Sequence, residues 1–295
     1  MQSLEALKQR VKEMDKKKIA IAAADAKILE VVELALEEDL AEFILIGDQK
    51  ALLEAIEAQG RNISCEIINI LDHKAAAEKA VELVKTKEAD VVMKGLLHTS
   101  TFLRAVLNKE KGLNTGKFIS QISVFDKEYG EGLQMVTDCA MAIEPTLEEK
   151  KSIIENAITL SHKLGIEMPK IALLSALEVV NPKIKDTMEA AVLSKMADRG
   201  QIKGGIVDGP LALDNAISQE AADHKGIKSP VAGKADVLVV PNLQVGNVLG
   251  KSLFFFAHKL AATAIVGTTA PIIMTSRTDF MENKLMSIVI ASYIA

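Results

Sequence analysis

The sequence predicts an α/β fold in which parallel or mixed sheets are flanked by helices. Short runs of β-branched residues, bounded by Gly, Asn or Asp, alternate along the chain with longer segments whose apolar residues recur at helical spacing. This alternation is typical of parallel βαβ units. The chain has 295 residues, and because one domain commonly holds ~100–200 residues, we expect about two domains.

Ten segments have the composition of strands, and three further segments have a clear helical period. The predicted strands are 18–24, 42–47, 64–70, 89–94, 119–125, 133–138, 170–175, 205–208, 235–241 and 264–267. The predicted helices, 26–40, 75–85 and 147–164, place apolar residues at i, i+3, i+4 and i+7. In the last of them Glu148 and Glu149 occupy the first turn and Lys163 the last, which the helix dipole favours.

The segment around Pro145 and Thr146 marks the predicted domain boundary. Thr146 is a typical N-cap residue, so a new helix begins here after a strand-like segment has ended. We therefore place the joint near residue 143. The first predicted domain comprises residues 1–143 and 271–295, and the second comprises residues 144–270.

Composition excludes several classes of function. The chain has 35 Lys and Arg against 40 Asp and Glu, a net charge of −5, and only 3% aromatic residues, so nucleic-acid binding is disfavoured. No apolar run approaches the ~18 residues of a membrane span, and we expect no membrane association. The charged start of the sequence lacks the apolar core of a secretion signal, which favours the cytoplasm.

The cysteines and histidines show no spacing typical of a metal site, so no metal is expected. Cys65 lies in an alternating segment and Cys139 in an apolar run. We expect both to be buried thiols, and the alternative is that one of them is reactive.

Arginine is scarce, with five residues against thirty lysines, and two of the five stand in unusual settings. Arg104 falls one turn into a predicted helix opened by Thr99 and Ser100. Their hydroxyls and the free N–H groups of the first turn, together with Arg104, could hold a phosphate. The alternative is an exposed arginine whose stem covers Phe102 and Leu107.

The second unusual arginine, Arg277, follows Ser276 at the end of an apolar segment and precedes Asp279 and Glu282. A hydroxyl, a guanidinium group and carboxylates in one loop could bind an oxyanion and move a proton. The alternative is an N-terminal capping box followed by surface charges.

The segment PNLQVGNVLGKS at 241–252 is similar to a nucleotide P-loop, but only three residues separate its glycines where that motif needs four. We therefore reject a nucleoside triphosphate site. Gly246 and Asn247 in front of a helix, with Lys251 one turn further, could still bind an anion. A plain strand-to-helix turn is the alternative.

Several segments together resemble the phosphate acetyltransferase and phosphate butyryltransferase family. They are MKGLLHTSTFLRAVL at 93–107, VTDCAMAIEPTLEEK at 136–150, DGPLALDNAIS at 208–218, SPVAGKADVLVVPNLQVGN at 229–247 and TSR at 275–277. The segments stand in the family's order, and the resemblance extends over most of the chain. The length, the segment around Arg104 and the SRTD ending look more like the butyryl branch.

The resemblance implies reversible transfer of an acyl group between coenzyme A and phosphate, passed directly in a ternary complex. It also implies a two-domain fold similar to isocitrate dehydrogenase, an active site in the cleft between the domains, and a homo-oligomer of at least two copies. Coenzyme A is then a substrate, and neither a metal nor a resident cofactor is implied.

The resemblance also implies roles for individual residues. Ser276 and Arg277 match the reacting pair of the family, and Arg104 matches an arginine near the phosphate. Thr99, Ser100 and Lys94 belong to the same motif as Arg104, and we expect them to bind substrate. Where the acetyl branch has its base, an Asp seven residues after the serine, this chain has Asn283.

The substitution at Asn283 leaves the general base open, because an amide cannot accept a thiol proton at neutral pH. Asp279 and Glu282 are the local candidates, and Asn283 stays a candidate for substrate binding. Three alternative functions also stay open: a phosphate acetyltransferase, a non-catalytic sensor of acyl-CoA or acyl phosphate, and a metal-dependent NAD(P) oxidoreductase.

Overall fold

The computed structural model describes residues 1–276 and 278–295, and the chain divides into two compact units. The N/C unit comprises Glu5–Lys117 and Ala262–Ala295, and the middle unit comprises Met1–Leu4 and Phe118–Ala261. The first division therefore falls at residue 117, whereas the sequence suggested a joint near residue 143. The reason is that residues 118–143 contain two strands of the middle unit's sheet, described below.

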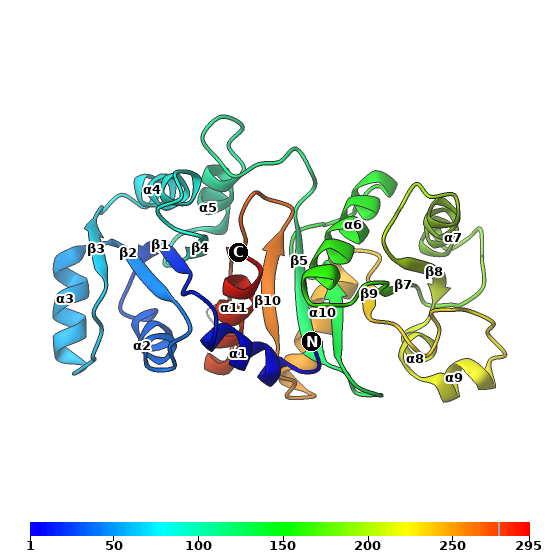
Figure 1. Cartoon of the computed structure of the whole chain (residues 1–295). Coiled ribbons are helices and arrows are strands. Elements are labelled where there is room, and N and C mark those ends of the chain that lie inside the picture. Colours follow the sequence, from blue (N-terminus) through cyan, green and yellow to red (C-terminus); the bar gives the residue numbers. More distant parts are fainter. Residues whose placement is uncertain (277) are drawn as a thin grey trace. The chain divides into compact units, whose positions relative to one another are not determined.

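The N/C unit has a sheet in which all neighbouring strands are parallel except at one edge (Figure 1). Its strand order is β3 (Glu66–Asn69), β2 (Glu42–Gly47), β1 (Lys18–Ala24), β4 (Val91–Lys94), β11 (Ile272–Ile273) and β10 (Ala262–Val266). β10 runs antiparallel to β11. The helices of this unit are α1 (Leu4–Lys12), α2 (Leu29–Glu37), α3 (Gln49–Ala58), α4 (His73–Lys85), α5 (Thr99–Val106) and α11 (Met281–Ile294).

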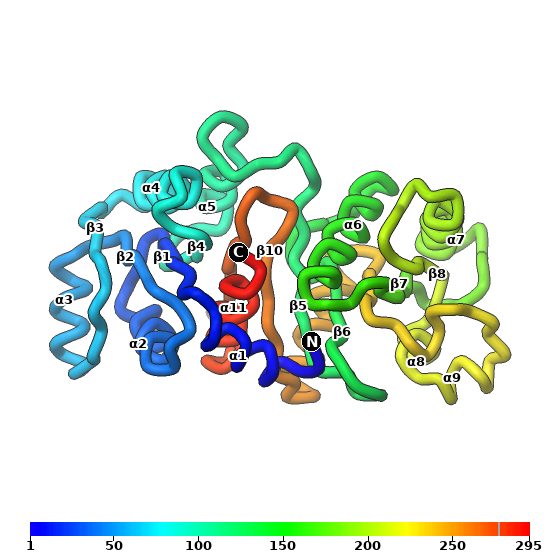
Figure 2. Tube along the Cα trace, viewed as in Figure 1, coloured from blue at the N-terminus to red at the C-terminus, as the bar shows by residue number. Residues whose placement is uncertain are grey.

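The C-terminal helix α11 forms part of the core of the N/C unit. Apolar side chains from Leu285 to Ile294 are buried on all sides of the helix, as expected of a helix without a solvent face. It packs against β10, β11 and α2. In Figure 2 this helix is the red end of the trace, within a unit whose other residues are mostly blue and cyan.

The middle unit has a second mixed sheet. Its strand order is β5 (Ser120–Asp126), β6 (Leu133–Thr137), β9 (Val237–Val239), β7 (Lys170–Leu174) and β8 (Ile206–Leu211), with only β5 and β6 antiparallel. Its helices are α6 (Leu147–Lys163), α7 (Lys185–Asp198), α8 (Leu213–Ile217), α9 (Gln219–His224) and α10 (Leu243–Phe255). Because β6 pairs with β9, the hairpin of β5 and β6 belongs to this unit.

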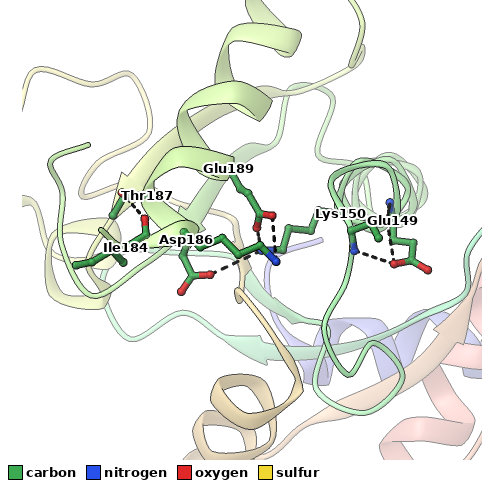
Figure 3. A network of polar contacts seen from close by, with 8 residues as sticks. Glu149, Lys150, Ile184, Asp186, Thr187 and Glu189 are labelled. Atoms are coloured by element: carbon green, nitrogen blue, oxygen red, sulfur yellow. Dashed lines mark hydrogen bonds and ion pairs between the residues drawn. The ribbon is translucent and has the colours of Figure 1, made fainter. Parts of the chain in front are cut away.

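An ion pair of a buried lysine with half-buried carboxylates joins α6 to α7 in the middle unit. Thr146 and Glu149 form a reciprocal capping box at the start of α6, which leaves the neighbouring Lys150 directed at α7 (Figure 3). The buried Nζ of Lys150 lies 2.6 Å from Oε2 of Glu189 and 4.0 Å from Oδ1 of Asp186. Removing one partner of such a pair leaves a buried charge without compensation, so this contact fixes how the two helices pack.

The α/β class and the flanking helices are confirmed. Every predicted strand is present, with ends that differ by at most three residues, and the three predicted helices are α2, α4 and α6. The short strand β11 was not predicted. No helix among residues 1–276 and 278–295 is long and apolar enough to span a membrane.

Candidate functional site

The carboxyl ends of β4 and β11 bring two of the predicted segments together. These strands are parallel neighbours in which Ile273 pairs with Met93, so Lys94 and Met274 continue from the same edge of the sheet. Lys94 ends β4 and leads to α5, and Ser276 follows β11. Because open α/β sheets bind ligands at the carboxyl ends of their strands, we call the segments 94–104 and 274–283 of this edge the β4/β11 site.

A tight turn presents Ser276 at the β4/β11 site. The backbone N–H of Ser276 donates to Oδ2 of Asp279 at 2.6 Å, and the N–H of Asp279 donates back to the carbonyl of Ser276 at 3.2 Å. The Ser276 hydroxyl is exposed and lies 3.0 Å from the hydroxyl of Thr278. Arg277, the predicted partner of Ser276, lies outside the described residues.

The three candidates that follow Ser276 have different surroundings. Asp279 is half-buried and contacts the backbone of Ser276, whereas Glu282 is exposed in the first turn of α11. Asn283 is buried, and its carbonyl accepts a hydrogen bond from the hydroxyl of Ser287 at 2.8 Å. Of the two carboxylates nominated as base, Asp279 is therefore the one in contact with the serine turn.

Helix α5 begins one residue earlier than the capping prediction required. Its N-cap is His98, whose side chain makes no capping bond, so Thr99 and Ser100 open the helix as predicted but do not cap it. They are its first two residues, and both are exposed. The N–H groups of a first helical turn have no intrahelical acceptor, and those of Thr99 and Ser100 belong to this set at the β4/β11 site.

Lys94 supports the loop between β4 and α5. Its ammonium group donates to the carbonyls of Gly95 at 3.2 Å and Leu97 at 3.1 Å. Gly95 has no room for a side chain, because an added Cβ would lie 2.3 Å from the carbonyl oxygen of Ala23. The loop therefore passes directly over the end of β1, and Lys94 binds two of its carbonyls.

Arg104 is exposed and lines a pocket of about 850 Å³ between α4 and α5. The other charged residues of the pocket are Lys74, Glu78, Lys79, Glu82, Lys85 and Lys111. Five cations thus face two carboxylates in a chain whose net charge is −5. The guanidinium group of Arg104 therefore lies at a local concentration of positive charge. Phe102, on the same helix, is fully buried.

The prediction that Gly246 and Asn247 lie in front of a helix is wrong. Helix α10 begins at Leu243, and the side chain of Asn242 caps it by accepting the N–H of Val245 at 3.1 Å. The N–H of Gly246 donates to the carbonyl of Asn242, so it is already used within the helix. Lys251 is exposed more than two turns from the helix start. Asn242, which follows Pro241, is the N-cap residue whose presence in the sequence marks the start of α10.

Gly246 has a packing role instead. A Cβ at this position would lie 2.3 Å from the carbonyl oxygen of Asp138, so the helix touches the turn after β6 directly. Asp138 is buried, and its carboxylate accepts N–H groups from Ala140 at 2.7 Å, Met141 at 2.8 Å and Gln121 at 3.3 Å. Burial raises the pKa of this carboxyl group, although backbone N–H donors, including that of Ala142, oppose the shift. The sequence analysis did not single out Asp138. A single acidic residue within an apolar run is the signal that could have indicated a buried carboxylate.

The two cysteines are both poor nucleophiles. Cys139 is buried, and burial, with a smaller effect of the Asp138 charge, raises its pKa to about 12. Cys65 is only half-buried, contrary to the prediction, because β3 is an edge strand, yet burial raises its pKa to about 11. Neither thiol is appreciably ionised near pH 7. No group of three or more His, Cys, Asp or Glu among the described residues could hold a metal ion.

Comparison with known proteins places the chain among acyl-transferring enzymes. It is 48% identical over 288 residues to a phosphate butyryltransferase of Clostridium acetobutylicum, covering 97% of this chain and 96% of that protein. It is 42% identical over 280 residues to a phosphate acetyltransferase of Thermotoga maritima, covering 95% of both chains. Its fold matches the crystal structure of a branched-chain phosphotransacylase from Enterococcus faecalis with a TM-score of 0.84 and 36% identity, covering 94% of this chain and 98% of the other.

The family comparison covers the site as well as the fold. Residues 73–292 match the family described as phosphate acetyl/butaryl transferase, a range that includes α4, α5, the segment Phe118–Ala261 of the middle unit, and the serine turn. The chain belongs to the phosphate acetyl/butaryl transferase family.

Proposed function

We propose that this protein transfers a butyryl group reversibly between coenzyme A and inorganic phosphate. The observation that carries the proposal is the exposed hydroxyl of Ser276, held by a turn at the carboxyl edge of the β4/β11 site, in a chain 48% identical to a phosphate butyryltransferase over nearly its full length. The identity to the phosphate acetyltransferase is lower, at 42%, which favours the butyryl substrate.

The reaction proceeds by direct attack in a ternary complex. In one direction the sulfur of coenzyme A attacks the carbonyl carbon of butyryl phosphate, a C–S bond forms, and the C–O bond to phosphate breaks. In the other direction a phosphate oxygen attacks the thioester, and the thiolate leaves. Both directions pass through a tetrahedral oxyanion, which a positioned donor stabilises by about 2.7–4 kcal/mol. The hydroxyl of Ser276 supplies this donor.

Positive charge at the same edge holds the phosphoryl group. The guanidinium groups of Arg277 and Arg104 bind its oxygens, and an arginine can do so through two parallel hydrogen bonds. The first-turn N–H groups of Thr99 and Ser100 add donors that suit an anion. Lys94 positions the loop between β4 and α5 and does not bind the substrate itself, since its ammonium group already binds two carbonyls of that loop.

Asp279 is the base that we favour for the thiol of coenzyme A. A free thiol with a pKa of about 8.5 is only a few per cent ionised at pH 7, so a base increases the rate by about one to two powers of ten through ionisation. Asp279 contacts the Ser276 turn, whereas Glu282 is exposed on α11. The proposed substrates are small molecules found in the cytoplasm, and coenzyme A enters as a substrate and not as a resident cofactor.

A phosphate-dependent assay tests the proposal across chain lengths. Thiol release from acetyl-, propionyl- and butyryl-CoA is followed at matched concentrations with and without phosphate. We expect butyryl-CoA to give the highest kcat/KM. One methylene in contact with an apolar pocket changes kcat/KM by ~10–200-fold. A preference for acetyl-CoA would make the protein an acetyltransferase. No phosphate-dependent release from any of the three would make it a sensor. Loss of activity in a chelator would instead indicate metal-dependent chemistry.

Substitution of Arg277 tests the phosphoryl contact. Arg277→Ala should lower kcat at least 10²-fold with an unchanged melting temperature, and Arg277→Lys should restore little, because an ammonium group lacks the planar pair of donors. Activity near that of the wild type in Arg277→Ala would remove this residue from the mechanism.

A further inference from the structure

Phe280 is an aromatic residue at a position where helix structure favours a polar one. It directly precedes α11 and is the N-cap of that helix, and its side chain makes no capping hydrogen bond. Ser, Thr, Asp and Asn are favoured at an N-cap, because their side chains accept an N–H group of the first helical turn. A phenyl ring accepts no such bond, so the chain lacks this stabilisation at the start of α11.

The ring of Phe280 is also in contact with water. Its exposed fraction is 42%, although aromatic side chains are among the largest apolar groups that a fold can bury. Phe280 lies in the segment 274–283 of the β4/β11 site. Departures from local rules of capping and burial are expected where a residue serves function and not stability. Phe280 makes both departures at the site that carries Ser276.

The turn at Ser276 brings Phe280 near the exposed hydroxyl of the serine. The N–H of Asp279 donates to the carbonyl of Ser276 at 3.2 Å and closes a turn of four residues. The Cα atoms at the ends of such a turn are less than about 7 Å apart, and the next Cα follows at about 3.8 Å. The Cα of Phe280 therefore lies within about 11 Å of that of Ser276, a distance that a phenyl side chain and a short acyl chain together can span.

The other exposed large apolar residue of the β4/β11 site belongs to a different surface. Leu96 is 36% exposed, and it lines a pocket of about 340 Å³ with Leu71 at the carboxyl ends of β1, β2 and β3. Among the described residues of the site, Phe280 is thus the exposed large apolar side chain on the segment that carries Ser276.

The chemistry of the proposed reaction indicates what lies against the ring. Ser276 is the proposed donor to the oxyanion, so the carbonyl carbon of the substrate lies beside its hydroxyl and the acyl chain extends from that carbon. The phosphoryl group is charged and the pantetheine arm of coenzyme A carries polar amides, whereas the acyl chain has no polar group and gains most from an apolar contact. The adenine of coenzyme A can also stack on a ring, but the whole pantetheine arm separates it from the sulfur.

We propose that the ring of Phe280 forms an apolar wall for the acyl chain and thereby sets the preference for chain length. The inference rests on the proposed acyl transfer and adds a specificity-determining residue to it. Each methylene that an apolar surface covers raises kcat/KM about fourfold. The two methylenes that distinguish butyryl from acetyl therefore account for about 15-fold.

The test compares kcat/KM for butyryl-CoA with kcat/KM for acetyl-CoA, measured with phosphate in matched variants. Phe280→Ala should lower this ratio about tenfold and leave the KM for phosphate unchanged, because the ring contacts the acyl chain alone. Phe280→Leu retains an apolar side chain and should keep most of the ratio. The control is Leu53→Ala on α3, where the leucine is 50% exposed outside the site, and it should leave the ratio unchanged.

Phe280→Ser separates a role in specificity from a role in stability. Serine supplies the N-cap acceptor that phenylalanine lacks, so the melting temperature should rise by about 2 °C while the ratio falls as in Phe280→Ala. A purely structural role for the ring predicts the opposite result, a lower melting temperature with an unchanged ratio. Thermal unfolding followed by circular dichroism measures the first quantity.

Three results would overturn the inference alone, each in a wild type that prefers butyryl-CoA. They are an unchanged ratio in both Phe280→Ala and Phe280→Ser, a ratio that rises because the ring had limited the chain, and a KM that increases equally for all acyl-CoA substrates because the ring had contacted coenzyme A. A wild type that prefers acetyl-CoA, or that releases no thiol in a phosphate-dependent way, would overturn the proposed function and this inference together.

Discussion

Ser276 donates its backbone N–H to Oδ2 of Asp279 at 2.6 Å, so the carboxylate three residues later holds the turn that presents the serine. The return bond from the N–H of Asp279 to the carbonyl of Ser276, at 3.2 Å, closes the same turn. Asp279 therefore has a positioning role that is independent of proton transfer. The two roles predict different effects for different substitutions.

Asp279→Ala should lower kcat more than Asp279→Asn, because the asparagine retains an oxygen that can accept the N–H of Ser276. A hydrogen bond to a charged group contributes about 1.5–3 kcal/mol, so loss of the positioning contact corresponds to roughly 10–100-fold in kcat. Steady-state kinetics with butyryl-CoA and phosphate measure both variants.

The pH dependence of the same variants identifies the base. If Asp279 accepts the thiol proton, Asp279→Asn removes the acid limb of the pH profile of kcat, whereas Glu282→Gln leaves it in place. The reverse result would assign the base to Glu282. A limb that persists in both variants would show that neither carboxylate is the base.

Ser276→Ala should lower kcat by about 10²–10³-fold through loss of a donor to the oxyanion. The side chain is exposed and its hydroxyl contacts only the hydroxyl and the N–H of Thr278 among the described contacts, so the melting temperature should stay that of the wild type. Thr278→Val, which removes the neighbouring hydroxyl and keeps the turn, is the control. Equal losses in the two variants would argue against a specific role for Ser276.

Arg104→Ala should raise the KM for phosphate or for coenzyme A by roughly tenfold, which corresponds to about 1.4 kcal/mol of lost binding to an anion. The side chain is exposed on α5, so stability should change little. The effect should shrink at high ionic strength, because salt screens exposed charges. An unchanged KM for both substrates would exclude Arg104 from binding either of them.

Gly246→Ala should destabilise the protein by about 1–3 kcal/mol, because the added Cβ would overlap the backbone of Asp138 and force α10 outward. Gly250→Ala is the matched control on the same helix. Its Cβ would lie 3.6 Å from Sγ of Cys139, an ordinary contact, and it should stabilise the helix by about 0.5–1 kcal/mol. Thermal unfolding followed by circular dichroism measures both, and equal melting temperatures would contradict the close approach at Gly246.

Asp138→Asn should change how stability depends on pH. Because burial raises the pKa of Asp138 in the folded state, the wild type loses stability from this group as the pH rises from the unfolded value of about 3.9 through the folded value. The asparagine does not titrate, and its oxygen can still accept the N–H of Ala140. The unfolding free energy of the wild type relative to the variant should therefore fall as the pH rises. Urea unfolding between pH 4 and 7 tests this, and a parallel dependence in both proteins would contradict it.

Much of the fold could be predicted because each strand and helix carries a local signal. β4 and α6 are examples, since the apolar run before Lys94 and the capping box at Thr146 each mark an element without reference to the rest of the chain. β11 lacks such a signal, because its two residues, Ile272 and Ile273, are too few to show alternation. Its position between β4 and β10 follows from pairing across the sheet.

The site could be predicted only in part, for the same reason. The pattern TSRTD marks Ser276 and Asp279, but the pattern does not reveal that the carboxylate binds the serine's own N–H. Asn242 could have placed the start of α10 correctly, and with it Gly246 inside the helix. The contact between Gly246 and Asp138 joins distant parts of the sequence, so no local rule identifies it.

The sheet of the N/C unit is completed by β11, a strand that is synthesised late in translation. β1 to β4 are synthesised first, but β11, which pairs with β4, and α11, which fills the core behind β10 and β11, follow the whole of Phe118–Ala261. The middle unit can therefore reach its native structure during translation, while the apolar edge of β4 stays open. Nascent chains arrested before residue 272 lack β11, so we expect a chaperone to bind them at the open edge of β4.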